Sequence, residues 1–165
     1  MAPAGEIWTV GHSTHPAERF VALVREHGIE VVADVRRFPA SRRHPQFNQT
    51  ALEESLRETG IAYEPFGEEL GGRRNPRPGG GPSPWRNRSF RGYAEYMETD
   101  EFAHGLERLE ALGSERRVAI MCAEGEWRRC HRRMISDALA GRGWRVTHIR
   151  PKGGLEGHEL TLGVD

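Results

Sequence analysis

The densest run of reactive side chains extends from Cys122 to Arg132 and reads CAEGEWRRCHR. It follows an apolar segment typical of a buried strand and leads into a predicted helix. Cys122 and Arg128 have five residues between them. At this spacing, backbone N–H groups and the arginine could hold an oxyanion beside a thiolate. Glu124 and Glu126 argue against this interpretation, because they would bring negative charge into the anion site.

The two cysteines of this run, Cys122 and Cys130, allow three further interpretations. Cys130 falls in the first turn of the predicted helix, where the helix dipole lowers a thiol pKa, so the pair could be redox-active. Together with His131 and His12, the cysteines could supply zinc ligands, although the spacing is not a standard one. Both could equally be buried as small apolar side chains. The sequence assigns no metal ligand and identifies no cofactor.

Two carboxylates are expected at the ends of buried strands. Asp34 ends one apolar strand and Glu124 follows another. A carboxylate in such a place is costly unless it is paired or used in catalysis. Pairing would involve Arg36 or Arg132. In catalysis, Asp34 and Glu124 could divide the acid and base roles if their surroundings separate their pKa values.

Other polar side chains follow the first and last predicted strands. His12 and Ser13 come directly after Gly11 at the end of the first strand, and His148 and Arg150 mark the end of the last one. Because His12 follows a glycine, it could approach a ligand closely. It could equally be a turn histidine that bonds only to the backbone.

Arginine supplies nearly all of the positive charge, and Lys152 is the only lysine. This composition suits phosphate and carboxylate binding, because a guanidinium is planar and always charged, but biased coding could also produce it. Arg36 follows the second predicted strand. His131 and Arg132 open a predicted helix, where free N–H groups favour an anion. The alternative is that these helix residues are merely exposed.

A long irregular segment occupies residues 71–91. It contains five glycines, four prolines and six arginines and no acidic residue, so regular structure cannot persist there. Its arginines alternate with Trp85 and Phe90, and such a mixture can bind phosphate and stack on bases. It could act as a positively charged lid over a crevice, or it could be a solvated loop.

Hydrophobic periodicity predicts alternating strands and helices over a single domain, 1–165. The predicted strands are 7–10, 30–35, 61–66, 117–121 and 144–149, and the predicted helices are 16–28, 50–60, 93–113 and one ending at 141. Thr50 and Glu53 have the spacing of a capping box, and the tail 153–165 is predicted to be loose. The alternation predicts a three-layer α/β fold of Rossmann or flavodoxin type. It has a mostly parallel five-stranded sheet with helices on both faces. Ligands of such sheets bind at the carboxyl ends of the strands, where the polar residues above would meet.

Composition excludes several classes of protein. The net charge is zero, so no global field attracts nucleic acid or a membrane. No stretch approaches the roughly 20 apolar residues of a membrane helix, and the start of the chain does not read as a secretory signal. Two cysteines are too few for a disulfide scaffold, which favours a cytoplasmic location.

Several motifs together resemble the domain-of-unknown-function 488 family, DUF488. They are TVGHST at 9–14, DVRRFPASRRHPQFN at 34–48, LGG at 70–72, FRGYAEYM at 90–97, MCAE at 121–124 and CHR at 130–132. The resemblance covers nearly the whole chain and implies a compact α/β domain, but no settled reaction. The signature residues that it implies are Gly11, His12, Ser13, Asp34, Arg36, Pro39, Ser41, Phe47, Asn48, Cys122, Glu124, Cys130, His131 and Arg132. Arg128 is not among them, and Glu126-Trp127 stands where the family often has proline.

The interpretation that uses most of these residues is a hydrolase or transferase acting on a phosphate-bearing small molecule or nucleotide. Its expected catalytic residues are Asp34, Glu124, His12 and Cys122. Its expected ligand-binding residues are Gly11, Ser13, Arg36, Ser41, Asn48, Cys130, His131 and Arg132. Two alternatives stay open: a nucleic-acid-binding module using the arginine-rich loop, and a thiol redox or metal-binding protein using Cys122, Cys130 and His131.

Overall fold

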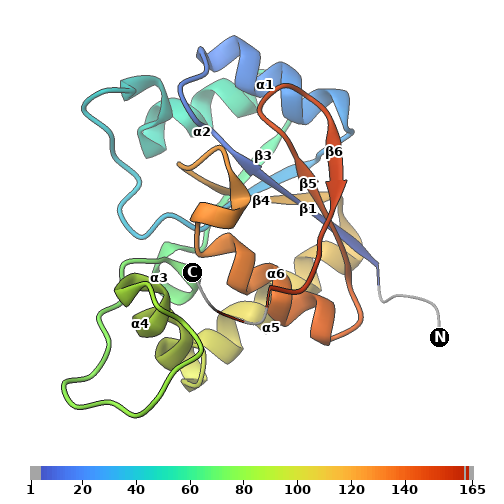
Figure 1. The fold of residues 1–165 in the computed structure, drawn as a ribbon. Helices are drawn as coiled ribbons and strands as arrows, with labels where there is room; N and C mark the ends of the chain where they lie inside the picture. The colour runs from blue at the N-terminus through green and yellow to red at the C-terminus, as the bar shows by residue number, and fades with distance from the viewer. Residues whose placement is uncertain (1–4, 162, 164–165) are drawn as a thin grey trace.

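Six β-strands form one sheet at the centre of the protein (Figure 1). The computed structural model describes residues 5–161 and 163. In chain order the strands are β1 (Glu6–Gly11), β2 (Val31–Asp34), β3 (Ala62–Pro65), β4 (Val118–Cys122), β5 (Arg145–Ile149) and β6 (Leu155–Gly157). Across the sheet their order is β3-β2-β4-β1-β5-β6, and all pairs are parallel except β5 with β6.

Helices cover both faces of the sheet, which confirms the predicted α/β class and its three layers. One face carries α1 (Ala17–Glu26), the short 3₁₀ helix η1 (Pro45–Phe47) and α2 (Gln49–Arg57). The other carries α3 (Gly67–Leu70), α4 (Arg88–Tyr96), α5 (Asp100–Glu115) and α6 (Arg132–Gly141). Figure 1 shows α1 and α2 on one side of the strands and α5 and α6 on the other.

Apolar residues on both sides of the central strands explain the two faces. In β4, Val118 and Ile120 pack into the core beneath α5 and α6, while Ala119 and Met121 pack into the core beneath α1 and α2. Successive side chains of a strand point to opposite faces, so a strand buried on both faces must be apolar throughout. The continuous apolar runs in the sequence therefore become the inner strands of the sheet.

The strand order differs from the Rossmann and flavodoxin expectation. In both of those orders the first two strands are neighbours, whereas here β4 lies between β1 and β2. The strand count is six rather than five, because Leu155–Gly157 forms β6 along β5. The prediction of a loose tail is wrong for this segment, and positions 162, 164 and 165 lie outside the described residues.

Two local predictions also need correction. The N-cap of α2 is Asn48 rather than Thr50, so the expected capping box does not form. The helix expected over 93–113 is two helices, because Thr99 accepts a hydrogen bond from the backbone N–H of Phe102 and starts α5 after a break. Within the described part of the chain, no helix combines the length and apolarity needed to cross a membrane.

Candidate functional site

A cavity of about 600 Å³ lies at the carboxyl ends of β1, β2 and β4. The chain leaves β1 and β2 toward the helices of one face, and it leaves β4 toward α6 on the other face. Loops that diverge in this way open a crevice between neighbouring strands. The sequence-predicted residues that line the cavity are His12, Ser13, Arg36, Ser41, Cys122, Glu124, Cys130 and His131. Those that lie behind its walls are Gly11, Asp34, Asn48 and Arg132.

His12 presents an unprotonated ring nitrogen to this cavity. Its Nδ1 donates a hydrogen bond to the Ser13 carbonyl at 2.8 Å, and its ring stacks on Phe47 with the centroids 4.3 Å apart. Because the carbonyl can only accept, Nδ1 carries the proton and Nε2 is the acceptor. Burial lowers the pKa of His12 to about 4, so the ring is neutral at physiological pH. His12 can therefore accept a proton but does not bring a positive charge.

The end of β1 approaches the loop after β4 closely. A Cβ atom on Gly11 would lie 1.9 Å from the carbonyl oxygen of Glu124, so only glycine fits there. The next backbone amides, of His12 and Ser13, donate to the carbonyls of Cys122 and Ala123 at 2.9 Å each. These contacts fix His12 and Ser13 beside the backbone that leaves β4 at Cys122.

Asp34 holds Arg36 rather than facing the cavity. Its carboxylate accepts four hydrogen bonds, from the backbone N–H, Nε and Nη2 of Arg36 and from the Tyr63 hydroxyl. Burial and the neighbouring Asp34 raise the pKa of Tyr63, which keeps this hydroxyl a donor. Arg36 still has N–H donors beyond those that Asp34 uses and lines the cavity. Asp34 is thus placed to position a cationic side chain, and Tyr63 is a partner that sequence reasoning missed.

Cys130 and His131 form a contact pair at the start of α6. Cys130 Sγ lies 3.4 Å from His131 Nδ1, and the backbone N–H of Arg132 donates to the same sulfur at 3.4 Å. His131 Nε2 donates to the Val35 carbonyl at 2.9 Å. This bond fixes the tautomer and leaves Nδ1 as the acceptor. The Cys130 thiol, the His131 base and the Val35 carbonyl that orients the base therefore form a chain of contacts, as at nucleophilic cysteines.

The pKa values of the two buried thiols are shifted in opposite directions. Burial raises the pKa of Cys122 well above its ordinary value, and its interaction with Cys130 raises it further. Burial also opposes ionisation of Cys130. Nevertheless, the Cys122 thiol, the Arg132 guanidinium and the Arg132 backbone N–H together lower the pKa of Cys130. Cys130 is therefore the more acidic of the two thiols, although the sequence-based interpretation placed Cys122 in the catalytic set.

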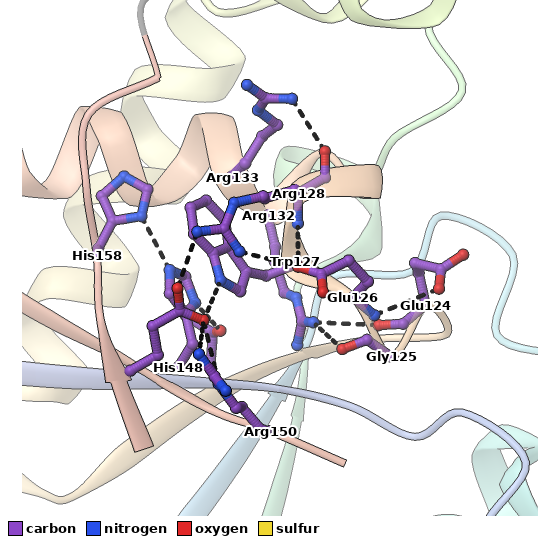
Figure 2. A network of polar contacts seen from close by, with 12 residues as sticks. Glu124, Gly125, Glu126, Trp127, Arg128, Arg132, Arg133, His148, Arg150 and His158 are labelled. Atoms are coloured by element: carbon purple, nitrogen blue, oxygen red, sulfur yellow. Dashed lines mark hydrogen bonds and ion pairs between the residues drawn. The ribbon is translucent and has the colours of Figure 1, made fainter. Parts of the chain in front are cut away.

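The guanidinium of Arg132 lies beneath the loop that connects β4 to α6 (Figure 2). The residue is 1% exposed, and its Nη2 donates to the carbonyls of Glu124 and Gly125 at 3.1 and 3.0 Å. Its Nε and Nη1 have no hydrogen-bond partner in the described chain. The expected ion pair between Arg132 and the Glu124 carboxylate does not form. Glu124 is instead exposed, and one of its carboxylate oxygens accepts from the backbone N–H of Glu126 at 3.3 Å.

Arg128 points away from the cavity, contrary to an anion loop built from Cys122 and Arg128. It pairs with Glu156 at 2.8 Å and with Glu126 at 3.4 Å. Its guanidinium also lies 4.4 Å from the ring centroid of Trp127. The neighbouring Arg129 lines the cavity.

His148 and Arg150 do not join the cavity, although they end β5. His148 is buried between Thr9 Oγ1, 2.6 Å from its Nδ1, and His158, 2.9 Å from its Nε2, and stacks on Trp127 (Figure 2). Burial, and then the nearby Arg132 charge, lower the pKa of His148 to about 2. Arg150 pairs with Glu156 on β6 at 3.1 Å. These contacts fasten β6 to the sheet.

Ser41 and Asn48 shape the loop after β2. The Asn48 side chain accepts from the backbone N–H of Ser41 at 2.6 Å, and the Ser41 hydroxyl accepts from the backbone N–H of His44 at 3.0 Å. Ser41 and His44 line the cavity, whereas Asn48 lies behind them. Phe38, in the same loop, also lines the cavity and is 59% exposed, which periodicity could not reveal.

The arginine-rich segment contributes less to the cavity than its composition suggests. Arg73 lines the cavity. Arg74 lies 3.7 Å from the ring centroid of Tyr96, and Arg77 pairs with Glu95. Of the proposed stacking residues of this segment, Phe90 lines the cavity and Trp85 does not, and they are only 7% and 8% exposed.

The fold and site define a three-layer α/β protein with a thiol- and arginine-lined cavity at the strand ends. The sequence profile described as Domain of unknown function DUF488 matches residues 16–139, so the chain belongs to this family. The resemblance inferred from the sequence motifs is thereby confirmed. No curated protein and no solved structure matches the chain. Within residues 5–161 and 163, no three or more His, Cys, Asp or Glu side chains gather in a way that could hold a metal ion.

Proposed function

We propose that this protein is a hydrolase or transferase of phosphate-bearing small molecules, with Cys130 as the nucleophile and His131 as its base. The observation that carries the proposal is the position of the Cys130 sulfur, 3.4 Å from His131 Nδ1 and 3.4 Å from the Arg132 backbone N–H, on the wall of the cavity. A lowered thiol pKa at a helix start is what nucleophilic cysteine chemistry requires.

The charge of the cavity wall supports an anionic substrate. The arginines that line it are Arg36, Arg37, Arg73 and Arg129. Glu124 is the only acidic residue among the described residues of the lining. Arginine binds phosphate through several N–H donors in a fixed geometry. A phosphate group bound here would therefore meet positive charge and a thiolate on the same wall.

The chemical steps balance without a cofactor. His131 Nδ1 takes the Cys130 proton, and the thiolate attacks phosphorus. The S–P bond forms as the P–O bond to the leaving group breaks, and the leaving oxygen takes the proton from His131. Water, or an acceptor alcohol in a transferase, then attacks phosphorus and gives a proton to His131. The S–P bond breaks, and the Cys130 sulfur takes this proton back from His131. The neutral Nε2 of His12 is a second acceptor in the cavity that can orient the attacking oxygen.

Alkylation tests the proposed nucleophile without knowledge of the substrate. We expect iodoacetamide at neutral pH to modify Cys130 at least about tenfold faster than Cys122, because only the Cys130 pKa is lowered. Inorganic phosphate should slow this modification by occupying the cavity. Peptide mass spectrometry gives both rates. Equal rates at the two thiols, or no protection by phosphate, would overturn the proposal.

Turnover of para-nitrophenyl phosphate tests the reaction class. Cys130→Ala and His131→Asn should each lower kcat by about 10² or more, the usual contribution of such groups. Arg145→Ala is a matched control, because Arg145 is an exposed arginine at the amino end of β5, whereas the cavity lies at the carboxyl ends of the strands. Loss of activity in the control, or retention in Cys130→Ala, contradicts the assignment.

A second candidate is a dithiol redox protein, favoured because both cysteines are free and line the same cavity. Oxidation by a peroxide would join Cys122 and Cys130 through an S–S bond. The two electrons and two protons released would reduce hydrogen peroxide to two waters, or an alkyl hydroperoxide to an alcohol and water. Mass spectrometry of the peroxide-treated protein under non-reducing conditions distinguishes the candidates. A rapidly formed Cys122–Cys130 disulfide favours the redox function, and its absence favours the nucleophile.

A further inference from the structure

An exposed aromatic ring lies on the wall of the same cavity. Phe38 lines it and keeps 59% of its surface exposed. A large apolar side chain left in water forgoes the stabilisation that burial would bring. A single exposed apolar residue needs no explanation, but the position of this one beside an anion site gives it chemical meaning.

Two arginines from different parts of the chain flank this ring. The Arg37 guanidinium lies 5.4 Å and the Arg73 guanidinium 5.9 Å from the Phe38 ring centroid. Arg37 also donates a hydrogen bond from Nη1 to the Arg73 carbonyl at 3.0 Å, which ties the loop after β2 to the segment after α3. The ring and both charges are thus held together at one place on the wall.

The backbone of this place is held in an uncommon conformation. Arg73 has a φ of 59°, in the left-handed region that non-glycine residues rarely adopt. The preceding Gly72 packs against the His131 ring so closely that a Cβ atom would lie 2.8 Å from Nδ1. Such conformations persist where the surrounding structure enforces them and are concentrated at ligand sites. The same segment therefore contacts the proposed base and places Arg73 beside Phe38.

We infer that the cavity binds a nucleoside monophosphate, with its phosphate among the arginines near Cys130 and its base stacked on Phe38. This inference rests on the proposed function and names its substrate class. An aromatic ring flanked by guanidinium groups stacks on a base without regard to sequence, because every base has a π-face. A cavity of about 600 Å³ is of a size that encloses one small ligand. Trp85 does not line the cavity, and Phe90 lines it with only 7% of its surface exposed, so Phe38 is the more open ring for stacking.

Calorimetric titration with three probes tests this inference. Adenosine 5′-monophosphate should bind at least about tenfold more tightly than ribose 5-phosphate, and ribose 5-phosphate about as tightly as inorganic phosphate. Phe38→Leu should remove the advantage of the nucleotide and leave the affinity for ribose 5-phosphate unchanged, whereas Phe38→Trp should keep it. Leu160→Ala is a control of matched exposure, because Leu160 is 58% exposed and does not line the cavity.

The outcomes separate this inference from the proposed function. Equal affinities for the nucleotide and ribose 5-phosphate overturn the stacking site but leave the anion site and the Cys130 chemistry intact. An unchanged nucleotide preference in Phe38→Leu also overturns it. If no probe binds, both the inference and the proposed function fall. If single-stranded oligonucleotides bind with a steep salt dependence and the mononucleotide does not, the ligand is nucleic acid and the inference is wrong.

Discussion

Removal of the charge of Asp34 should destabilise the protein more strongly than removal of any one of its hydrogen bonds. Asp34 and Arg36 are 1% and 8% exposed and pair at 2.8 Å. Asp34→Asn preserves the size of the side chain but leaves the Arg36 guanidinium buried without its counter-charge. The amide also turns an N–H group toward donors that the carboxylate accepted from Arg36 and Tyr63.

The expected cost follows from this geometry. When one member of a buried ion pair is removed, the remaining charge typically costs about 3–5 kcal/mol. Tyr63→Phe removes only one donor from a carboxylate that keeps the three from Arg36, so about 1.5 kcal/mol is expected. With a slope of about 2 kcal/mol per molar urea, Asp34→Asn should lower the unfolding midpoint by about 1.5–2.5 M.

Urea unfolding followed by circular dichroism measures both variants against the wild type. The order of the two effects is the critical result, because it separates the loss of charge from the loss of one hydrogen bond. The reasoning is refuted if Asp34→Asn lies within about 1 kcal/mol of the wild type. It is also refuted if Tyr63→Phe costs more than Asp34→Asn, since Tyr63 would then be the main support.

Three further predictions concern one residue that lines the cavity, His12, and two that lie behind its walls, Gly11 and Arg132. Burial lowers the pKa of His12 from 6.5 to about 4, so between these values the unfolded chain binds a proton that the folded protein does not. The contribution of neutral His12 to the unfolding free energy is therefore complete above pH 6.5. As the pH falls toward 4, the unfolding free energy declines by up to about 3 kcal/mol. His12→Asn should flatten the pH dependence of the unfolding free energy, and an unchanged slope would contradict this. Gly11→Ala should destabilise by several kcal/mol or fail to fold, because its Cβ would lie 1.9 Å from a backbone oxygen. Gly141→Ala is the control and should be neutral, because a Cβ there would meet no atom of another segment within 4 Å. Equal thermal stability of the two variants would count against the close approach of Gly11 to the Glu124 carbonyl. Arg132→Met should move the pH profile of Cys130 alkylation to higher pH, since Arg132 lowers the Cys130 pKa; an identical profile would show that Arg132 acts only on the loop.

The sequence predicts the edge of the sheet where the site lies, but not the strand order. Runs such as 118–121 are apolar throughout, which marks strands buried on both faces, and the residues that end parallel strands must meet at one edge. Strand order depends on which helices pack together across the layers, and local periodicity carries no information about that. The segment 155–157 has no strand pattern, and its place in the sheet depends on contacts of Glu156 with Trp127 and Arg150.

For the site residues too, the sequence pattern predicts which residues reach the cavity, but the orientation of each side chain depends on tertiary contacts. His12, Cys122 and Glu124 follow strands, and their presence at the cavity follows from topology. The direction in which Asp34 points depends on Tyr63, which lies on the neighbouring strand and has no functional pattern of its own. The preference for Cys130 over Cys122 depends on the buried Arg132, whose guanidinium and backbone N–H lower the Cys130 pKa. The tautomer of the neighbouring His131 depends on a hydrogen bond to the Val35 carbonyl, 96 positions away in the chain. Contacts of this kind arise only when the tertiary structure forms.

The buried guanidinium of Arg132 also sets the polarity of the loop above it. The carbonyls of residues 122–125 all find donors inside the protein: the first two bond to the backbone amides of His12 and Ser13, and the last two bond to Arg132. In a trans peptide the N–H points opposite to the C=O, so the amide of Gly125 is directed away from the interior. The backbone of the loop thus keeps these carbonyl oxygens below and turns the Gly125 N–H outward, beside the exposed carboxylate of Glu124.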